Sequence, residues 1–259
     1  MKTPLEIVVT NDDGITAPWI ALLAETASEF GNVTVIAPDR NWSATGHQKA
    51  LGRSMRVDPA APVGRAPAYA CDHSPSDCSA LAGLGFLNKK IDVVFSGVNP
   101  TNNVSRDITY SGTVTAALEA TIWGMRAAAF SLDEPGSYAE NRDIVKPYLR
   151  RAIRTFSGIA LPPFTILNFN FPDPETLKRG QSEFVITVQG ERVYRDELIR
   201  RVDPFGRPYY WFGGDKPEGD THPGTDCGEI ARGNISVTPL HLDLTAREEL
   251  AALRKVVWN

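Results

Sequence analysis

Two adjacent aspartates follow the first apolar segment of the chain. Residues 6–10, Glu-Ile-Val-Val-Thr, have the composition of a buried strand and lead into Asn11, Asp12, Asp13 and Gly14. Neighbouring carboxylates repel each other unless a cation neutralises them, and hard divalent cations prefer carboxylate and neutral oxygen ligands. The same four residues are also favourable turn chemistry, and one aspartate could cap a following helix. The pair therefore predicts either a divalent-metal site or a simple turn.

Two further apolar segments end close to oxygen donors. Residues 33–38 lead into a loop that contains Ser43, and residues 92–99 end at Asn99. In open α/β sheets, ligands bind beyond the carboxyl ends of the strands. If the three segments are neighbouring parallel strands, the Ser43 hydroxyl and the Asn99 amide join the aspartate pair. Agreement between three strand ends favours the metal site over the turn.

A helix start follows in the sequence. Ser111, Gly112 and Thr113 open a segment with helical periodicity that Gly124 closes. Free backbone N–H groups and the helix dipole favour an anion there, and the small Gly112 lets an anion approach the backbone. An ordinary serine N-cap explains the same residues. A metal site beside an anion-binding helix start is the layout of a phosphoryl-transfer site.

Four other features have open roles. His47 lies in the Ser43 loop, where it could reach a substrate or remain solvated, and His241 fits packing or a subunit contact. Asp226 either holds a loop that connects the C-terminal region to the active edge or belongs to a simple turn. The aromatic residues 209–212 could stack on a base, although burial is the safer interpretation.

Apolar segments alternate with helical patterns along most of the chain. Strands are expected at residues 6–10, 33–38, 92–99, 127–132, 164–172 and 234–245. Helices are expected at residues 17–30, 74–87, 111–124, about 137–156 and 246–258, with Pro18 and Ser74 at two starts and Gly31 as a stop. Near-continuous apolar strands indicate burial on both faces, so we expect a single α/β domain over residues 1–259 with a mostly parallel sheet flanked by helices. Residues 175–232 carry hairpin signals and predict an antiparallel, extended excursion for core packing or a subunit contact.

The composition restricts the classes of partner. The chain has 259 residues, of which 42% are hydrophobic and 22% charged, and its net charge of −4 argues against binding to a nucleic-acid polymer. No apolar run reaches the length of a membrane span, and no signal peptide is evident at the start. Cys71, Cys78 and Cys227 have no zinc-type spacing and are expected to be small buried side chains. We therefore expect a cytoplasmic protein with no membrane partner.

Seven short motifs together resemble one family. They occur between residue 7 and about residue 245 and are Asn-Asp-Asp-Gly (11–14), Ala-Pro-Asp-Arg (37–40) with Ser43 and Gly-His (46–47), Ser-Pro-Ser-Asp-Cys (74–78), Ser-Gly-Val-Asn (96–99), Tyr-Ser-Gly-Thr-Val (110–114), Pro-Gly-Thr-Asp (223–226) and Ile-Ser-Val-Thr-Pro-Leu (235–240). The first motif alone is weak, but the ordered set is specific. The chain resembles the SurE family, the stationary-phase survival 5'-nucleotidases.

The resemblance implies a fold, an activity and a set of site residues. It implies a Rossmann-like core, hydrolysis of nucleoside 5'-monophosphates, often of 3'-monophosphates and in some members of short polyphosphate, and a homodimer or homotetramer built through the C-terminal excursion. By motif position, the catalytic residues would be Asp12 and Asp13, and one divalent ion, Mg²⁺ or Mn²⁺, would be held by Asp12, Asp13, Ser43 and Asn99. The phosphate-binding residues would be Asn103, Ser111, Gly112 and Thr113. A metal-activated water would attack phosphorus in line, with Asp12 favoured for orienting or deprotonating it.

The chain departs from the family pattern in one loop. The segment from Asn99 to Ser105 lacks the two glycines that are usual there, and Arg106 stands where an acidic or small residue is common. We expect intact metal chemistry, altered specificity and rate, and an added positive charge that could assist an anionic substrate.

Two other classes remain as alternatives. A haloacid-dehalogenase-like phosphatase requires an Asp-x-Asp pattern after the first strand, whereas the two aspartates here are adjacent. A receiver-like sensor is about half this length and requires a phosphorylated aspartate after the third strand, where this chain has Asn99.

Overall fold

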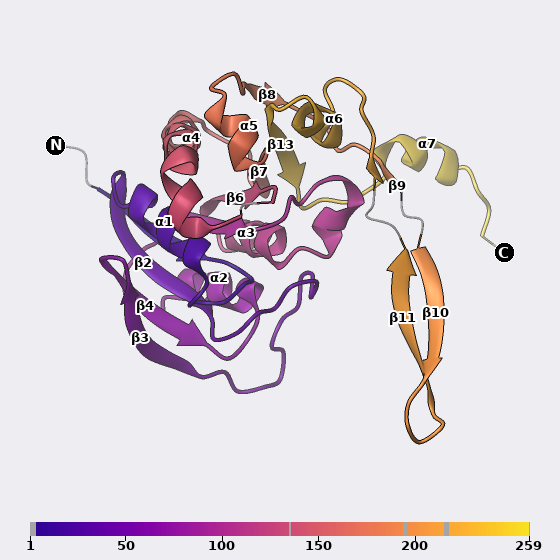
Figure 1. Cartoon of the computed structure of the whole chain (residues 1–259), viewed down its shortest axis with the longest axis horizontal. Helices are drawn as coiled ribbons and strands as arrows, with labels where there is room; N and C mark the ends of the chain where they lie inside the picture. The colour runs from indigo at the N-terminus through magenta and orange to yellow at the C-terminus, as the bar shows by residue number, and fades with distance from the viewer. Residues whose placement is uncertain (1–3, 135, 194–195, 215–217, 259) are drawn as a thin grey trace.

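The chain folds around one large sheet. The computed structural model describes residues 4–134, 136–193, 196–214 and 218–258 (Figure 1). The described residues form a nine-stranded sheet in the order β3-β4-β2-β1-β5-β6-β7-β13-β8. Its strands are β1 (Leu5–Thr10), β2 (Gly31–Pro38), β3 (Val57–Val63), β4 (Ala66–Cys71), β5 (Val93–Asn99), β6 (Arg126–Leu132), β7 (Thr165–Phe171), β8 (Phe184–Ile186) and β13 (Ile235–His241).

The predicted mostly parallel sheet is confirmed. The six strands β4, β2, β1, β5, β6 and β7 are parallel to one another, while β3 pairs antiparallel with β4 and β13 antiparallel with β7. The central strands read as continuous apolar runs because helices cover both of their faces, and every residue of β5 is buried.

Helices form one layer on each face of the sheet (Figure 1). The layer of α1 (Pro18–Ala27), α4 (Tyr138–Gly158) and α5 (Pro174–Lys178) packs on a core that includes Phe95 and Phe130. The opposite layer of α2 (Pro75–Gly83) and α3 (Gly112–Ile122) packs on a second core with Val8 and Val94. Successive residues of β1 and β5 serve the two cores alternately, as the period of a strand requires. The shared strands therefore hold both layers in register.

The predicted helix starts are confirmed, but one predicted stop is wrong. Pro18 is the first residue of α1, and the Ser74 side chain caps α2 by accepting a hydrogen bond from the Asp77 N–H. Helix α1 ends at Ala27, and Gly31 instead begins β2. A Cβ atom at Gly31 would lie 2.2 Å from the Leu5 carbonyl oxygen, so the close pairing of β1 and β2 requires this glycine.

Three elements differ from the sequence expectation. The edge hairpin of β3 and β4 was not predicted, and helix α6 (Asp226–Ala231) lies in a region expected to be extended. The closing helix expected over residues 246–258 is reduced to a 3-10 turn, Arg247–Glu249, and the four-residue α7 (Leu250–Leu253). Both of these last elements are exposed, so no core contact extends them.

The excursion contains the predicted antiparallel hairpin. Strand β10 (Asp196–Val202) pairs with β11 (Pro208–Gly214), and β9 (Arg192–Val193) pairs with β12 (Glu218–Gly219). The β10–β11 hairpin projects away from the body of the molecule (Figure 1). Its aromatic residues Tyr209–Phe212 are 41–90% exposed, so the expected burial is wrong for the single chain. Residues 194–195 and 215–217 of the predicted excursion lie outside the described residues.

The three cysteines are placed as the sequence predicts, and the helices can be checked for length and hydropathy. Cys71, Cys78 and Cys227 are free and buried, as predicted. None of the helices in the described part of the chain combines the length and hydropathy that a bilayer crossing requires.

Candidate functional site

The three predicted strand ends meet at one cavity. Strands β2, β1 and β5 are adjacent and parallel, so their carboxyl ends lie side by side at one edge of the sheet. A cavity of about 400 Å³ lies there. Its lining includes all four predicted oxygen donors, which are Asp12, Asp13, Ser43 and Asn99.

Asp12 is fixed by the start of helix α3. Its side chain is 3% exposed, and the Thr113 hydroxyl donates a hydrogen bond to its Oδ1. Burial raises the pKa of Asp12, and the Thr113 hydroxyl together with the N–H groups of Gly112 and Thr113 acts in the opposite direction. The helix start therefore does attract an anion, but that anion is the protein's own carboxylate.

The three residues of the helix start have different positions relative to the cavity. Ser111 lines it, and its Oγ accepts a hydrogen bond from the Val114 N–H at 3.0 Å, which confirms the N-cap interpretation. Gly112 and Thr113 are not among the lining residues and reach the cavity only through Asp12.

Asp13 carries a charge that no neighbour among the described residues compensates. Burial and the adjacent charge of Asp12 raise the pKa of Asp13 to about 7. Among the described residues, none donates a hydrogen bond to this carboxylate or forms an ion pair with it. Two carboxylates with one uncompensated charge, next to a hydroxyl and an amide oxygen, are a donor set that suits a hard divalent cation.

Asn99 and Ser43 present oxygen atoms to the same cavity. The Asn99 Nδ2 donates to the Thr101 carbonyl oxygen at 2.5 Å, which leaves the amide oxygen available to coordinate a cation. The Ser43 loop is tied to the aspartates because the Trp42 N–H donates to the Asp12 carbonyl oxygen at 2.7 Å. Further along, the Gly46 N–H donates to the Tyr110 carbonyl oxygen at 3.0 Å. The exposed Ser43 therefore lies between two residues, Trp42 and Gly46, whose backbones are fixed by hydrogen bonds.

His47 belongs to a third anchor of this loop and does not line the cavity. Its Nε2 lies 2.8 Å from the Glu119 carboxylate, which also accepts hydrogen bonds from Lys49 and Trp123. Burial raises the pKa of Glu119, but the bonds from His47, Lys49 and Trp123 outweigh it and bring the pKa to about 2. His47 therefore helps to hold the Ser43 loop against helix α3 through its contact with Glu119. His241 is exposed and accepts a hydrogen bond from the nearby Asp243 N–H.

Asn103 lines the cavity while its amide is engaged elsewhere. Its Nδ2 donates to the Ser131 Oγ at 2.8 Å, and its backbone N–H donates to the Asn170 Oδ1 at 2.8 Å. The Asn103 carbonyl oxygen accepts from the Asn168 side chain. These bonds attach the glycine-poor loop to β6 and β7.

Among the described residues, the basic side chain that lines the cavity is Arg192 and not Arg106. Arg192 lines the cavity and forms an ion pair with Asp107, another lining residue. Arg106 is largely exposed, and its guanidinium lies 3.5 Å from the Glu191 carboxylate. The added charge that the sequence suggested at Arg106 therefore faces solvent. No local motif marks Arg192, which comes from the excursion.

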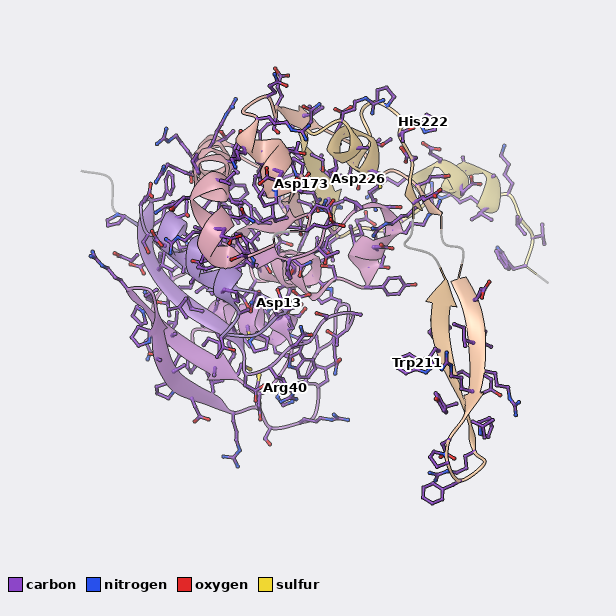
Figure 2. The ribbon with its side chains drawn as sticks, in the orientation of Figure 1. Asp13, Arg40, Asp173, Trp211, His222 and Asp226 are labelled. Atoms are coloured by element: carbon purple, nitrogen blue, oxygen red, sulfur yellow. The ribbon has the colours of Figure 1, made fainter. Side chains whose placement is uncertain are left out.

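Asp226 connects the excursion to the Asn99 loop, which agrees with the bridging role that was one of its two predicted roles. The side chain is fully buried, and it accepts hydrogen bonds from the N–H groups of Ser105, Gly190 and Cys227 at 2.7–2.8 Å. Figure 2 shows Asp226 on α6. This single carboxylate joins the end of the Asn99 loop to the segment that carries Arg192.

Replacing Asp226 with Asn should lower the free energy of unfolding by about 2 kcal/mol. The new amide nitrogen would face an N–H donor, and a buried N–H without an acceptor costs about 1–3 kcal/mol. Urea unfolding in the presence of EDTA measures the change in the free energy of unfolding. Asp143→Asn, at a side chain that is 86% exposed on α4, is the matched control and should change stability by less than about 0.5 kcal/mol. Equal stability of the two variants would refute this role.

Comparison with known proteins places the chain in a family. A parallel sheet with a polar cavity beyond the carboxyl ends of its central strands defines an α/β protein of the Rossmann-like class with its ligand site at that edge. The model of the family described as "Survival protein SurE" matches residues 7–196. The chain belongs to the SurE family.

Individual relatives match almost the whole chain. It is 40% identical to the 5'-nucleotidase SurE of Herpetosiphon aurantiacus and 43% identical to that of Chloroflexus aggregans, in each case over 98% of this chain and 99% of the relative. The crystal structure of the SurE protein from Aquifex aeolicus matches with a TM-score of 0.76 and 32% identity, over 96% of this chain and 98% of that one. Family membership confirms the resemblance and decides against the haloacid-dehalogenase-like and receiver-like alternatives.

Proposed function

We propose that the protein is a metal-dependent phosphomonoesterase that hydrolyses nucleoside 5'-monophosphates to nucleoside and phosphate. Relatives named 5'-nucleotidase SurE align with nearly all of the chain. The observation that carries the proposal is the meeting of two aspartates, a serine and an asparagine from three strand ends at one cavity. Nucleoside 3'-monophosphates and short polyphosphate are further candidate substrates. The site of action proposed for this chain is the cytoplasm.

The cofactor proposed is one divalent ion, Mg²⁺ or Mn²⁺, held by oxygen atoms of Asp12, Asp13, Ser43 and Asn99. When bound, such an ion acts as a Lewis acid that stabilises charge on a phosphate oxygen and activates water. Asp13 contributes the uncompensated charge that attracts the ion. Asp12, held in one orientation by Thr113, is suited to orient the attacking water and accept its proton.

The phosphate would lie between the aspartates and the opposite wall of the cavity. Ser111 and Asn103 line that space, and Arg192 supplies positive charge to it. Gly112 and Thr113 would act indirectly by fixing Asp12. Phosphate release would thus depend on side chains from the Ser43 loop, the Asn99 loop, helix α3 and the excursion.

Removing divalent ions should abolish phosphate release from AMP. Treatment with EDTA is expected to lower the rate by at least about 10³-fold, and added Mn²⁺ or Mg²⁺ should restore it while Na⁺ should not. Inorganic phosphate is measured with AMP, 3'-AMP and tripolyphosphate as substrates, and a phosphodiester serves as the negative control. A rate that survives complete chelation would refute the proposed function.

We further propose a homodimer or homotetramer that uses the β10–β11 hairpin as a subunit contact. Leu198, Trp211 and Phe212 are 66%, 61% and 90% exposed on this projecting element, and grouped exposed apolar side chains are typical of protein interfaces. Figure 2 shows Trp211 on the hairpin, away from the body of the molecule.

Replacing both Trp211 and Phe212 with Ser should convert the assembly into monomers. The reason is that the contact would lose its two largest apolar side chains, each of which stabilises an interface by about 2 kcal/mol or more. Light scattering after size exclusion measures the mass. The control is Leu84→Ser, which removes a similarly exposed apolar side chain from the body of the protein. An unchanged mass of the double variant would contradict the assignment.

A further inference from the structure

Helix α3 presents one hydrogen-bonding face to the Ser43 loop. A series of residues at a spacing of four runs from its N-cap to its C-cap: Ser111, Thr115, Glu119 and Trp123. Residues at this spacing lie on the same face of a helix. Ser111 lines the proposed catalytic cavity, whereas Glu119 is not among its lining residues. The face therefore leads from the cavity to a carboxylate about two helical turns away.

The Glu119 carboxylate joins the Ser43 loop to the end of α3. Its side chain is 5% exposed, and both of its oxygen atoms are engaged. The Lys49 Nζ and the Trp123 Nε1 donate to Oε1 at 2.8 Å, and the His47 Nε2 lies 2.8 Å from Oε2. Hydrogen bonds to an ionised group are roughly twice as strong as those between neutral groups. Glu119 is thus a strong attachment point for two residues of the loop.

The part of the loop beyond Ser43 lies on α2 and α3. The Thr115 Oγ1 donates to the Gly46 carbonyl oxygen at 3.0 Å, and the Ser74 Oγ donates to the Gln48 carbonyl oxygen at 2.6 Å. Ser43 itself is exposed, and a side chain of the same loop binds its N–H. The position of the Ser43 hydroxyl relative to the aspartates therefore depends on how the helices hold the following residues.

We propose that Glu119 is a positioning residue, which holds His47 and Lys49 on α3 and thereby fixes the loop that presents Ser43 to a divalent ion. The inference rests on the proposed function, since it takes Ser43 to be a metal ligand. The first turn of the same helix orients Asp12. One rigid helix thus sets the distance between two proposed ligands, and a loosened loop leaves the ligand in the chain but out of place.

Replacing Glu119 with Leu tests this role. Leucine is similar in size and in helix propensity but accepts no hydrogen bond. The Kd of Mn²⁺, measured by electron paramagnetic resonance without substrate, is expected to rise by about 10-fold or more, as is typical when a group that orients a metal ligand is lost. The Mn²⁺ concentration that half-saturates AMP hydrolysis should rise by the same factor. Excess Mn²⁺ should restore most of kcat, because no residue of the cavity is altered.

Two further variants serve as controls. Glu25→Leu removes a carboxylate that binds Arg142 and Lys146 in the opposite helix layer, and it should leave the Kd of Mn²⁺ unchanged. Glu119→Gln keeps one oxygen and adds an amide N–H, to which the neutral His47 ring can offer its acceptor nitrogen. This variant should therefore retain most of the Mn²⁺ affinity that Glu119→Leu loses.

A double-mutant cycle separates positioning from a general loss of stability. If Glu119 acts through Ser43, the Kd of Mn²⁺ rises in Ser43→Ala, and adding Glu119→Leu raises it no further. An equal additional loss in the Ser43→Ala background, or an unchanged Kd in Glu119→Leu alone, would overturn the proposal. If the wild type binds no Mn²⁺, or Ser43→Ala binds it as tightly as the wild type, the proposed metal site fails and the inference fails with it.

Hydrogen exchange in EDTA supplies a readout that needs no metal. The N–H groups of Gly46 and Ala50 should exchange about 10-fold faster in Glu119→Leu, while those of β1 should not change. Unaltered exchange at both loop positions would contradict the role of Glu119. Lys49→Met removes one of the three donors from the partly exposed loop side. It should raise the Kd of Mn²⁺ even if Glu119→Leu does not fold, and an unchanged Kd in this variant would also refute the proposal.

Discussion

Replacing Asp13 with Asn should lower metal-dependent phosphate release by about 10³-fold and, in the absence of metal, make the protein more stable at pH 8. The activity falls because the uncharged amide no longer attracts a divalent ion. The stability rises because the wild-type protein, without an ion, must keep two neighbouring carboxylates charged in a largely buried place.

The stability difference should depend on pH in a defined window. Burial and the charge of Asp12 raise the pKa of Asp13 from 3.8 to about 7 in the folded protein. Between these values the folded state binds more protons at Asp13 than the unfolded state, so wild-type stability falls as pH rises. The advantage of Asp13→Asn should therefore be small near pH 4, grow up to about pH 7 and stay constant above it. Its size should be on the order of 1–3 kcal/mol after allowance for solvent screening.

Urea unfolding in EDTA from pH 4 to pH 8, together with AMP turnover in Mn²⁺, checks both effects. Asp58→Asn, at an exposed position on β3, should change neither property. Full activity of Asp13→Asn would exclude Asp13 as a metal ligand. A variant less stable than wild type at pH 8 in EDTA would show that another group already compensates this charge.

The central sheet could be predicted because its strands carry an unambiguous signal. Strands β1, β2 and β5 are buried on both faces, so each appears as an apolar run between helical patterns. Strand β3 has the sequence Val-Asp-Pro-Ala-Ala-Pro-Val, in which two prolines oppose a strand assignment. The two prolines are tolerated because β3 lies at the edge of the sheet. That position is set by the topology of the whole sheet and cannot be read from the sequence of the segment.

The site could be predicted to the extent that it depends on strand ends. Asp12, Ser43 and Asn99 each follow a recognisable strand, and the topology brings those ends together. Arg192 could not be found in this way, because its contact with Asp107 joins residues 85 positions apart and no local pattern marks either one. The helix start at Ser111 could be recognised as an anion site, but the sequence does not show that Asp12 is the anion.

Replacing Gly112 with Ala should lower phosphate release by about 10²-fold and the free energy of unfolding by about 1–3 kcal/mol. A Cβ atom at this position would lie 2.7 Å from the Asp12 Cβ and 3.2 Å from the Pro75 Cγ. Either Asp12 or the first turn of α3 has to move, and both movements disturb the hydrogen bond between Thr113 and Asp12. The effect is steric, because Gly112 has a backbone conformation that alanine also adopts.

Gly158→Ala provides the matched control for Gly112→Ala. Gly158 is the last residue of α4, also has a φ angle that suits alanine, and no neighbouring atom lies within 4 Å of a Cβ placed there. Alanine at this position should leave activity unchanged and stabilise the protein by up to about 1 kcal/mol, because it restricts the unfolded chain. Comparison of the two variants therefore separates the effect of a restricted backbone, which both share, from the effect of the steric clash, which only Gly112→Ala has. If Gly112→Ala retains wild-type turnover and metal affinity, Asp12 does not need the close approach of α3, and the fixed orientation assigned to Asp12 in catalysis has to be abandoned.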